Sequence, residues 1–238
     1  MNSNHIFQHD RVIIFGRYPI PGKAKKRLIP VLGQAGAADL QRRLMERTLA
    51  TVRAIASWRG TGVEIRLEGG NEEKVRRWIG SDTILSQQGP RDLGHRMHAA
   101  FLEAFQVGCN RVVLVDADTP TLTTDHLREA FDTLTVHDLV LGPRIDGGFW
   151  LIGLRQPLDG FLDIKWSAGR VVEQTVALAR RQGIEFHLLD RLRGIDTGED
   201  LKKWRPEEAR SRPYISVIIP VFNEAAKIKA TINEARKK

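Results

Sequence analysis

The chain has 238 residues, with 37 lysines and arginines against 29 aspartates and glutamates, which gives a formal net charge of +8. No apolar run approaches the roughly 20 residues of a membrane span, and the N-terminus lacks the pattern of a secretory signal. A single cysteine, Cys109, excludes an internal disulfide and suits a reducing cytosol. We therefore expect a cytoplasmic protein. The basic residues are dispersed, which favours a phosphate pocket and argues against nucleic acid as a partner.

Apolar runs alternate with amphipathic segments along most of the chain, and these patterns predict strands and helices in turn. The first half is expected to hold strands at residues 11–16, 63–67, 83–86 and 111–115 and helices at residues 35–57, 72–79 and 94–105. The second half is expected to hold helices at 124–134, 167–181 (capped by Ser167) and 199–204 and strands at 138–142, 148–153 and 185–189. This alternation predicts a three-layer α/β/α domain with a mostly parallel sheet of about seven strands.

The loop after the first strand is a candidate phosphate site. It contains Gly16 and Gly22, followed by Lys23, Lys25 and Arg27. Backbone N–H groups and cationic side chains of such a loop can both face a phosphate. It is not a Walker loop, because the spacing of the glycines differs and no Ser or Thr follows the lysine. A solvated basic loop is the alternative interpretation.

Two carboxylates follow the apolar strand of the sequence VVLVDADTP, at Asp116 and Asp118. Open α/β sheets bind ligands outside the carboxyl ends of their strands. Mg²⁺ is usually held there by one or two carboxylates together with phosphate oxygens. The pair therefore predicts a divalent metal beside a nucleotide, although a turn or a helix cap would also account for an Asp at a strand end.

Three later segments are further candidates. Asp146, Gly147 and Gly148 form a turn in which paired glycines permit a ligand to approach the backbone closely, although a plain Asp-Gly hairpin turn is equally compatible. Asp196 is either a third carboxylate for the metal or a helix cap. At the junction before the helix at 94–105, Asp92 is a candidate cap.

The end of the chain has a different character. Residues 206–213 are charged and flanked by prolines, like a linker, and residues 214–238 suggest a strand, a turn and a helix. A single unit of this kind cannot bury its own apolar face. We interpret residues 1–205 as one domain and residues 214–238 as the incomplete start of a second module. A terminal strand and helix added to the main domain is the alternative.

The segments PGKAKKRL, DLGHRM, DADTPTL, GPRIDGGFWLIGL, KWS and DTGEDL occur together in this order. In this respect the chain resembles, over roughly residues 11–201, a bacterial family of glycosyltransferase-A-like proteins. That family is often labelled nucleotide-diphospho-sugar transferase and is similar to the guanylyltransferases of deazaflavin and molybdopterin cofactor synthesis. The resemblance implies a nucleotide-diphospho-sugar transferase-like fold.

The resemblance also implies roles for particular residues. Lys23, Lys25 and Arg27 match the phosphate loop of the family, and Asp118 matches its acidic position after the central strand. Asp146, Gly147 and Gly148 match its Asp-Gly-Gly segment. Trp166 and Ser167 match its Trp-Ser pair, and Asp196 matches its late acidic position. Asp116 stands where the family usually has Gly. Asp118 is therefore the more secure of the two metal ligands, and Asp196 competes with Asp116 for the second place.

We thus expect a transferase that takes a nucleoside diphosphate-sugar and holds Mg²⁺ or Mn²⁺ with Asp118 and either Asp116 or Asp196. Lys25 and Arg27 would add positive charge, Asp146 would be a general base or a polar anchor, and Leu93 and Gly94 would help to embrace the nucleotide. One alternative is a nucleotidyltransferase that uses a nucleoside triphosphate. Another is a non-catalytic nucleotide-binding or docking module, because the tail resembles the start of a family-two glycosyltransferase, a possible functional partner.

Overall fold

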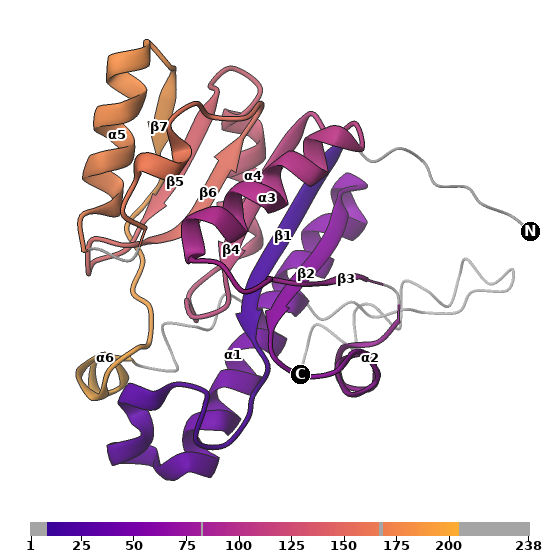
Figure 1. Ribbon diagram of the computed structural model, residues 1–238, viewed down its shortest axis with the longest axis vertical. Coiled ribbons are helices and arrows are strands. Elements are labelled where there is room, and N and C mark those ends of the chain that lie inside the picture. Colours follow the sequence, from indigo (N-terminus) through magenta and orange to yellow (C-terminus); the bar gives the residue numbers. More distant parts are fainter. Residues whose placement is uncertain (1–8, 82, 167–168, 205–238) are drawn as a thin grey trace, which may run out of the picture.

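The computed structural model describes residues 9–81, 83–166 and 169–204. Figure 1 shows a central sheet with helices packed on both of its faces. Its strands are β1 (Asp10–Arg17), β2 (Gly62–Glu68), β3 (Ile84–Gln87), β4 (Arg111–Asp116), β5 (Leu139–Pro143), β6 (Phe149–Leu154) and β7 (Phe186–Leu188). Their order is β3-β2-β1-β4-β6-β5-β7, and β6 runs antiparallel to both neighbours. The predicted three-layer α/β/α fold with a mostly parallel seven-stranded sheet is confirmed.

The helices lie close to their predicted positions. They are α1 (Ile29–Arg59), α2 (Glu72–Ile79), α3 (Leu93–Gln106), α4 (Thr124–Thr133), α5 (Val171–Gln182) and α6 (Gly198–Lys203), with 3-10 turns at Lys26–Leu28 and Phe161–Asp163. Helix α1 begins earlier than predicted, because a non-helical backbone at Gly33 interrupts the periodicity of its first turns. The predicted Ser167 cap is wrong: α5 starts at Val171 with Arg170 at the N-cap, and Ser167 lies outside the described residues.

Alternate side chains of the central strands enter different cores. Val12 and Ile14 of β1 pack into a core with α1, α2 and α4, whereas Ile13 and Phe15 pack with α3 and α5 on the opposite face. Side chains of a strand alternate between the faces of a sheet. Since helices cover both faces, the central strands are apolar at nearly every position, which is why they were readily predicted.

A smaller apolar cluster joins the loop after β1 to the segment after β7. Leu28, Leu40, Leu44 and Ile195 are buried together, and Trp204 packs against them. In Figure 1, α6 accordingly lies beside the N-terminal part of α1. The cluster brings two segments that are distant in the sequence to the same edge of the sheet, so it determines where the neighbouring polar side chains lie.

The carboxyl ends of β1, β4 and β5 point to this same edge. Phe15 of β1 lies beside Asp116 of β4 in the parallel register, and Arg144 follows the last residue of β5. The predicted ligand position outside the strand ends is therefore the place where these segments meet.

Three further predictions concern the rest of the chain. The one cysteine of the sequence, Cys109, is buried. None of the helices in the described ranges has the length and apolar character that crossing a bilayer requires. The predicted linker at 206–213 and the predicted module at 214–238 lie outside the described residues.

Candidate functional site

A cavity of about 650 Å³ opens where the carboxyl ends of the strands meet. Its walls come from the loop after β1, the start of α3, the end of β4, the turn between β5 and β6 and the segment after β7. The predicted site residues that line it are Gly16, Lys25, Arg27, Leu93, Asp116, Asp118, Asp146, Gly148 and Asp196. Segments that the sequence could identify only one by one therefore share a single cavity.

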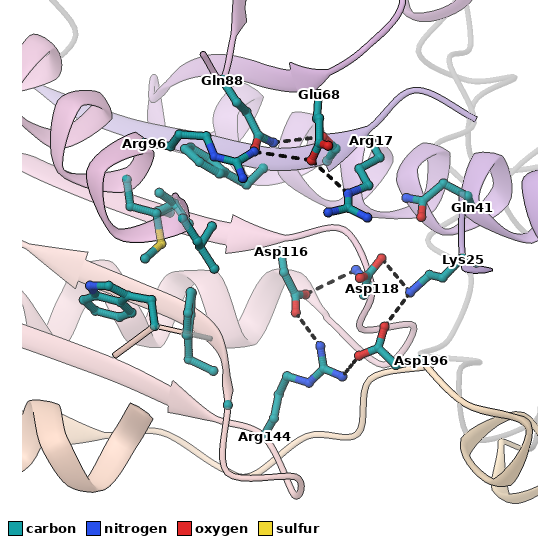
Figure 2. A pocket seen from close by; sticks show the side chains of 18 of the residues that line it. Arg17, Lys25, Gln41, Glu68, Gln88, Arg96, Asp116, Asp118, Arg144 and Asp196 are labelled. Atoms are coloured by element: carbon teal, nitrogen blue, oxygen red, sulfur yellow. Dashed lines mark hydrogen bonds and ion pairs between the residues drawn. The ribbon is translucent and has the colours of Figure 1, made fainter. Parts of the chain in front are cut away.

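The Lys25 ammonium is the centre of one group of contacts. Its Nζ lies 2.9 Å from Asp118 Oδ1, 2.9 Å from Asp196 Oδ1 and 2.6 Å from the carbonyl oxygen of Ile195. Figure 2 shows the Lys25 side chain directed between the two carboxylates. Burial alone would lower the pKa of Lys25, but the charges of Asp118 and Asp196 outweigh it and raise the pKa. Lys25 is therefore protonated and positively charged at physiological pH.

Arg144 is the centre of a second group. Its guanidinium contacts Asp116 at 3.1 Å, Asp146 at 3.1 Å and the second carboxylate oxygen of Asp196. Burial alone would lower the pKa of Arg144, but these carboxylates raise it. Asp196 bridges the two groups, because one of its oxygens faces Lys25 and the other faces Arg144 (Figure 2).

The two carboxylates after β4 have different surroundings. Asp116 Oδ1 accepts from the Asp118 N–H at 3.2 Å and from Thr119 Oγ1 at 3.0 Å, and Oδ2 faces Arg144. Burial, together with the nearby charge of Asp118, raises the pKa of Asp116 to about 7 in spite of the arginine. Asp116 and Asp118 therefore do not converge on one cation, whereas Asp118 and Asp196 do.

The pKa of Asp196 shifts in the opposite direction. Burial would raise it, but the positive charges of Lys25 and Arg144 lower it to about 2. Asp196 is thus ionised at every physiological pH, although part of its side chain is buried. The negative charge of Asp196 therefore interacts with both Lys25 and Arg144 over the whole physiological pH range.

A divalent ion would be held by Asp118 and Asp196. Among the described residues, no group of three or more His, Cys, Asp or Glu side chains is arranged to hold a metal without other ligands. Two carboxylates nevertheless fit Mg²⁺ or Mn²⁺ chemically, because hard cations prefer oxygen ligands and Mg²⁺ commonly takes the remainder from phosphates and water. The donor set therefore fits a metal that binds together with a phosphorylated ligand.

The opposite end of the cavity carries a polar group that the sequence analysis did not identify (Figure 2). The Glu68 carboxylate pairs with Arg17 at 3.0 Å and with Arg96 at 3.3 Å. Arg96 also donates to Gln88 Oε1 at 2.9 Å, while Gln88 Nε2 donates to the carbonyl oxygen of Gly16 at 2.9 Å. Arg17 and Glu68 are the last residues of β1 and β2. A polar residue at the carboxyl end of each predicted strand is the signal that could have found them.

Four predicted site residues do not line the cavity. Gly22 lies in a turn with φ of 78°, and Lys23 is exposed. A Cβ on Gly94 would overlap the indole of Trp166, which does line the cavity, and a Cβ on Gly147 would overlap the backbone of a neighbouring loop. Gly94 and Gly147 therefore allow the walls to pack closely rather than facing the cavity.

Comparisons with known proteins agree with this architecture. The chain is similar to the solved structure of the "putative nucleotide-diphospho-sugar transferase" of Desulfovibrio desulfuricans G20, with a TM-score of 0.78 and 29% identity over 97% of this chain and 96% of that one.

Two further solved structures share the fold alone. They are a CMP:2-keto-3-deoxy-manno-octonic acid synthetase in complex with CTP (TM-score 0.51, 13% identity, 85% of this chain and 99% of that one) and the 4-diphosphocytidyl-2C-methyl-D-erythritol synthase of Anaerococcus prevotii DSM 20548 (TM-score 0.55, 10% identity, 82% and 94%). No protein of curated function matches the chain. A family model described as an uncharacterized protein conserved in bacteria (DUF2064) matches residues 48–168. The match spans about half of the chain, including α3, β4 and the β5–β6 turn of the cavity, and the chain belongs to this family.

Proposed function

We propose that this protein is a transferase whose donor is a nucleoside diphosphate-sugar, bound with its phosphates in the cavity at the strand ends. The observation that carries the proposal is the convergence of Lys25, Asp118 and Asp196 at the carboxyl end of β4. Ligands of open α/β sheets bind at this position. The similar protein from Desulfovibrio desulfuricans carries the name of such a transferase, which supports the same assignment.

Cationic side chains give the phosphates several partners. Lys26 and Arg27 are exposed, line the cavity and form no ion pair with any described residue. Ion pairs between such side chains and phosphates are among the stronger hydrogen-bonded contacts in proteins. Lys25 and Arg144 lie deeper in the same cavity. The diphosphate is thus expected to bridge the exposed and the buried cations.

The base would occupy the far end of the cavity, near the start of α3. The Glu68 carboxylate, the Gln88 amide and the guanidinium groups of Arg17 and Arg96 supply both acceptors and donors for the edge of a base. Leu93 lines the adjacent wall. In this arrangement the base and the sugar lie on opposite sides of the phosphates.

Asp118 and Asp196 would hold Mg²⁺ or Mn²⁺. When bound, such an ion offsets the negative charge that develops on a departing diphosphate. Asp116 would act through its neighbours: it accepts from the Asp118 backbone N–H and from Arg144, and so it orients both. These contacts make Asp116 a positioning residue.

Asp146 is the candidate to accept a proton from the acceptor hydroxyl. Its side chain is 57% exposed at the rim of the cavity, and its Oδ2 lies 3.1 Å from Arg144. A general base must lie within hydrogen-bond reach of the proton that it abstracts, and a rim position leaves the carboxylate open to an acceptor that enters from solvent. Since Gly148 N–H donates to its Oδ1 at 3.0 Å, the carboxylate is also fixed in orientation.

Nucleotidyl transfer from a nucleoside triphosphate is the second candidate. It is favoured by the cations at one end of the cavity, where the exposed Lys26 and Arg27 lie near the carboxylate-paired Lys25 and Arg144 and add positive charge for a triphosphate. The two reactions release different products. Glycosyl transfer releases a nucleoside diphosphate, and nucleotidyl transfer releases pyrophosphate.

A thermal-shift screen of nucleoside triphosphates and nucleotide-sugars, each with and without Mn²⁺, tests the proposal on the full chain. A ligand at about 100 times its dissociation constant stabilises a protein by roughly 2.7 kcal/mol. Ligands that raise the melting temperature would then be incubated with candidate acceptors, and the released diphosphate or pyrophosphate identified by chromatography. If no nucleotide raises the melting temperature, the proposal is wrong.

Asp118→Asn is the test variant and Asp159→Asn is its control, because each substitution removes one negative charge. Asp159 is exposed and lies outside the cavity. We expect Asp118→Asn to abolish the additional shift that Mn²⁺ gives and Asp159→Asn to preserve it. Full turnover by Asp118→Asn would show that the carboxylate is not part of the chemistry.

A further inference from the structure

Lys25 occupies the position that a metal would need. Three oxygen atoms surround its ammonium at 2.6 to 2.9 Å: one carboxylate oxygen each from Asp118 and Asp196, and the carbonyl oxygen of Ile195. Carboxylate and carbonyl oxygens are the ligands that hard divalent cations prefer. The same set of oxygens can therefore surround either an ammonium or a metal, but not both.

The backbone of Lys25 is strained where its side chain enters this position. Its φ of 45° and ψ of 47° are left-handed, and within the described ranges it is the one residue other than glycine with a positive φ. Such conformations are unfavourable for residues with a Cβ and persist where surrounding contacts maintain them. The buried neighbours Ala24 and Leu28 anchor the loop on either side. The packing of these neighbours and the contacts of the ammonium together hold this residue in place.

The two carboxylates that contact Lys25 differ in their other ion pairs. Asp196 has a second cationic partner in Arg144. For Asp118, Lys25 is the single ion-pair partner among the described residues. Withdrawal of Lys25 would leave Asp118 without a cation, in a cavity that several other carboxylates also line. A divalent ion entering at that moment would restore the charge balance.

We infer that the Lys25 ammonium is the resident cation of this site in the nucleotide-free protein, and that a divalent ion binds between Asp118 and Asp196 once Lys25 has turned to the phosphates of the incoming nucleotide. The inference rests on the proposed function, since the phosphates are what attract Lys25 away. It makes Lys25 both a phosphate ligand and a device that excludes metal until the donor is present. Metal and nucleotide should then bind with positive coupling, which is reciprocal by thermodynamic linkage.

Titration of the full chain with Mn²⁺ alone, followed by the electron paramagnetic resonance signal of the free ion, tests the first half of the inference. Lys25→Asn removes the ammonium, and Asn tolerates a left-handed backbone better than most residues. Lys25→Met removes the charge but keeps much of the length. Lys74→Met is the matched control, because Lys74 is exposed on α2 and does not line the cavity.

We expect both Lys25 variants to bind Mn²⁺ without nucleotide at least roughly ten-fold more tightly than the wild type, because a unit positive charge is removed from within a few ångströms of the ion. Lys74→Met should match the wild type. The inference is overturned if the wild type binds Mn²⁺ as tightly as the Lys25 variants. It is also overturned if Lys25→Asn, shown by its melting curve to be folded, binds no Mn²⁺ at all.

A second titration in the presence of a nucleotide-sugar tests the exchange itself. The nucleotide should increase the Mn²⁺ affinity of the wild type more than that of Lys25→Asn, because only the wild type has a cation to withdraw. An equal increase in both proteins overturns the exchange. Failure of the proposed function gives a different result. In that case no nucleotide raises the melting temperature of the wild type, but the Mn²⁺ affinities of the wild type and the Lys25 variants without nucleotide still test whether Lys25 excludes the metal.

Discussion

Arg144 owes its position to a glycine in the segment after β7. A Cβ on Gly194 would overlap the Arg144 guanidinium, so no larger residue fits at position 194 without moving the arginine. The guanidinium holds three carboxylates of the cavity, those of Asp116, Asp146 and Asp196. The backbone of the segment after β7 thus determines how charged side chains are arranged at the end of β4 and in the turn between β5 and β6.

Gly194→Ala should therefore displace Arg144 and lower the free energy of unfolding by about 1–3 kcal/mol, the usual range for overpacking a buried site. Urea denaturation measures this change, and the nucleotide-induced thermal shift should fall with it. The control is the same substitution in an Arg144→Met background, where a flexible side chain can yield. If Gly194→Ala costs as much there as in the wild type, the overlap with Arg144 is not the cause.

Asp116 predicts a particular dependence of stability on pH. Its pKa rises from 3.8 unfolded to about 7 folded, so between roughly pH 4 and 7 the folded state binds more protons than the unfolded state. Stability then falls as the pH rises through this window. We expect this fall to be at most about 4 kcal/mol in the wild type, from roughly 1.4 kcal/mol for each unit by which the pKa is raised. It should be absent in Asp116→Asn, as measured by urea denaturation at several pH values.

The opposite sign applies to Asp196. Its pKa is lowered from 3.8 to about 2, so its contribution is complete above about pH 4 and is lost as the pH falls towards 2. The two windows do not overlap, which allows the contribution of each carboxylate to be separated. If the stability of the wild type changes between pH 4 and 7 in the same way as that of Asp116→Asn, the assignment for Asp116 is wrong.

Individual site residues could be predicted where a local pattern marked them. Lys25, Asp118 and Asp196 each stand in a short polar segment next to an apolar run, and each lines the cavity. Arg144 lies within such a segment too, but nothing in that segment tells which carboxylates it meets. Its partners come from β4 and from the segment after β7, and the chain must fold before they are neighbours.

At the level of elements, β2 differs from the other central strands. Ile65 and Leu67 enter the core with α1, whereas Glu64 and Arg66 are buried on the opposite side. Arg66 pairs with Glu64 at 2.6 Å and with Glu103 of α3 at 2.6 Å. Breaking a buried ion pair leaves an uncompensated charge, which is costly even where the intact pair adds little.

Glu64→Gln should therefore reduce the free energy of unfolding by about 3 kcal/mol, near the lower end of the cost of breaking a buried pair, because Arg66 keeps its contact with Glu103. Glu64→Gln combined with Arg66→Met should recover part of this loss, because the charges of Glu64 and Arg66 are then both removed and only the contact of Arg11 with Glu64 at 3.3 Å is still lost. Urea denaturation of the two variants provides the comparison. An equal loss in the double variant would show that the packing of β2, rather than the unpaired charge, governs the effect.

The elements themselves were predictable because their causes are local. Strands covered on both faces are apolar at most positions, and Asp92 caps α3 through its own side chain, as predicted. Thr123 caps α4 in the same way. The place of β6 between β4 and β5 was not predictable. Strand order depends on which edge a returning strand pairs with, and the turn at residues 144–148 is compatible with several arrangements.

On the scale of the whole molecule, the cavity is completed by the last described segment. The segment after β7 supplies Asp196 and the Ile195 carbonyl to Lys25. Leu201 and Trp204 pack against the apolar cluster that also contains Leu28. The described part of the site thus depends on the segment after β7.

A chain that ends at residue 204 should melt at the same temperature as the full chain and show the same nucleotide-induced shift. A chain that ends at residue 193 should be markedly less stable and lose the shift, because Lys25 would lose two of its three oxygen partners and the Leu28 cluster would lose Ile195. Circular dichroism melts of the three chains, with and without nucleotide, make the comparison. If the chain that ends at 204 unfolds at a lower temperature than the full chain, residues 205–238 belong to the same cooperative unit. The tail would then be a terminal addition to the main domain and not the start of a second module, since an independent module would leave the stability of the first unchanged.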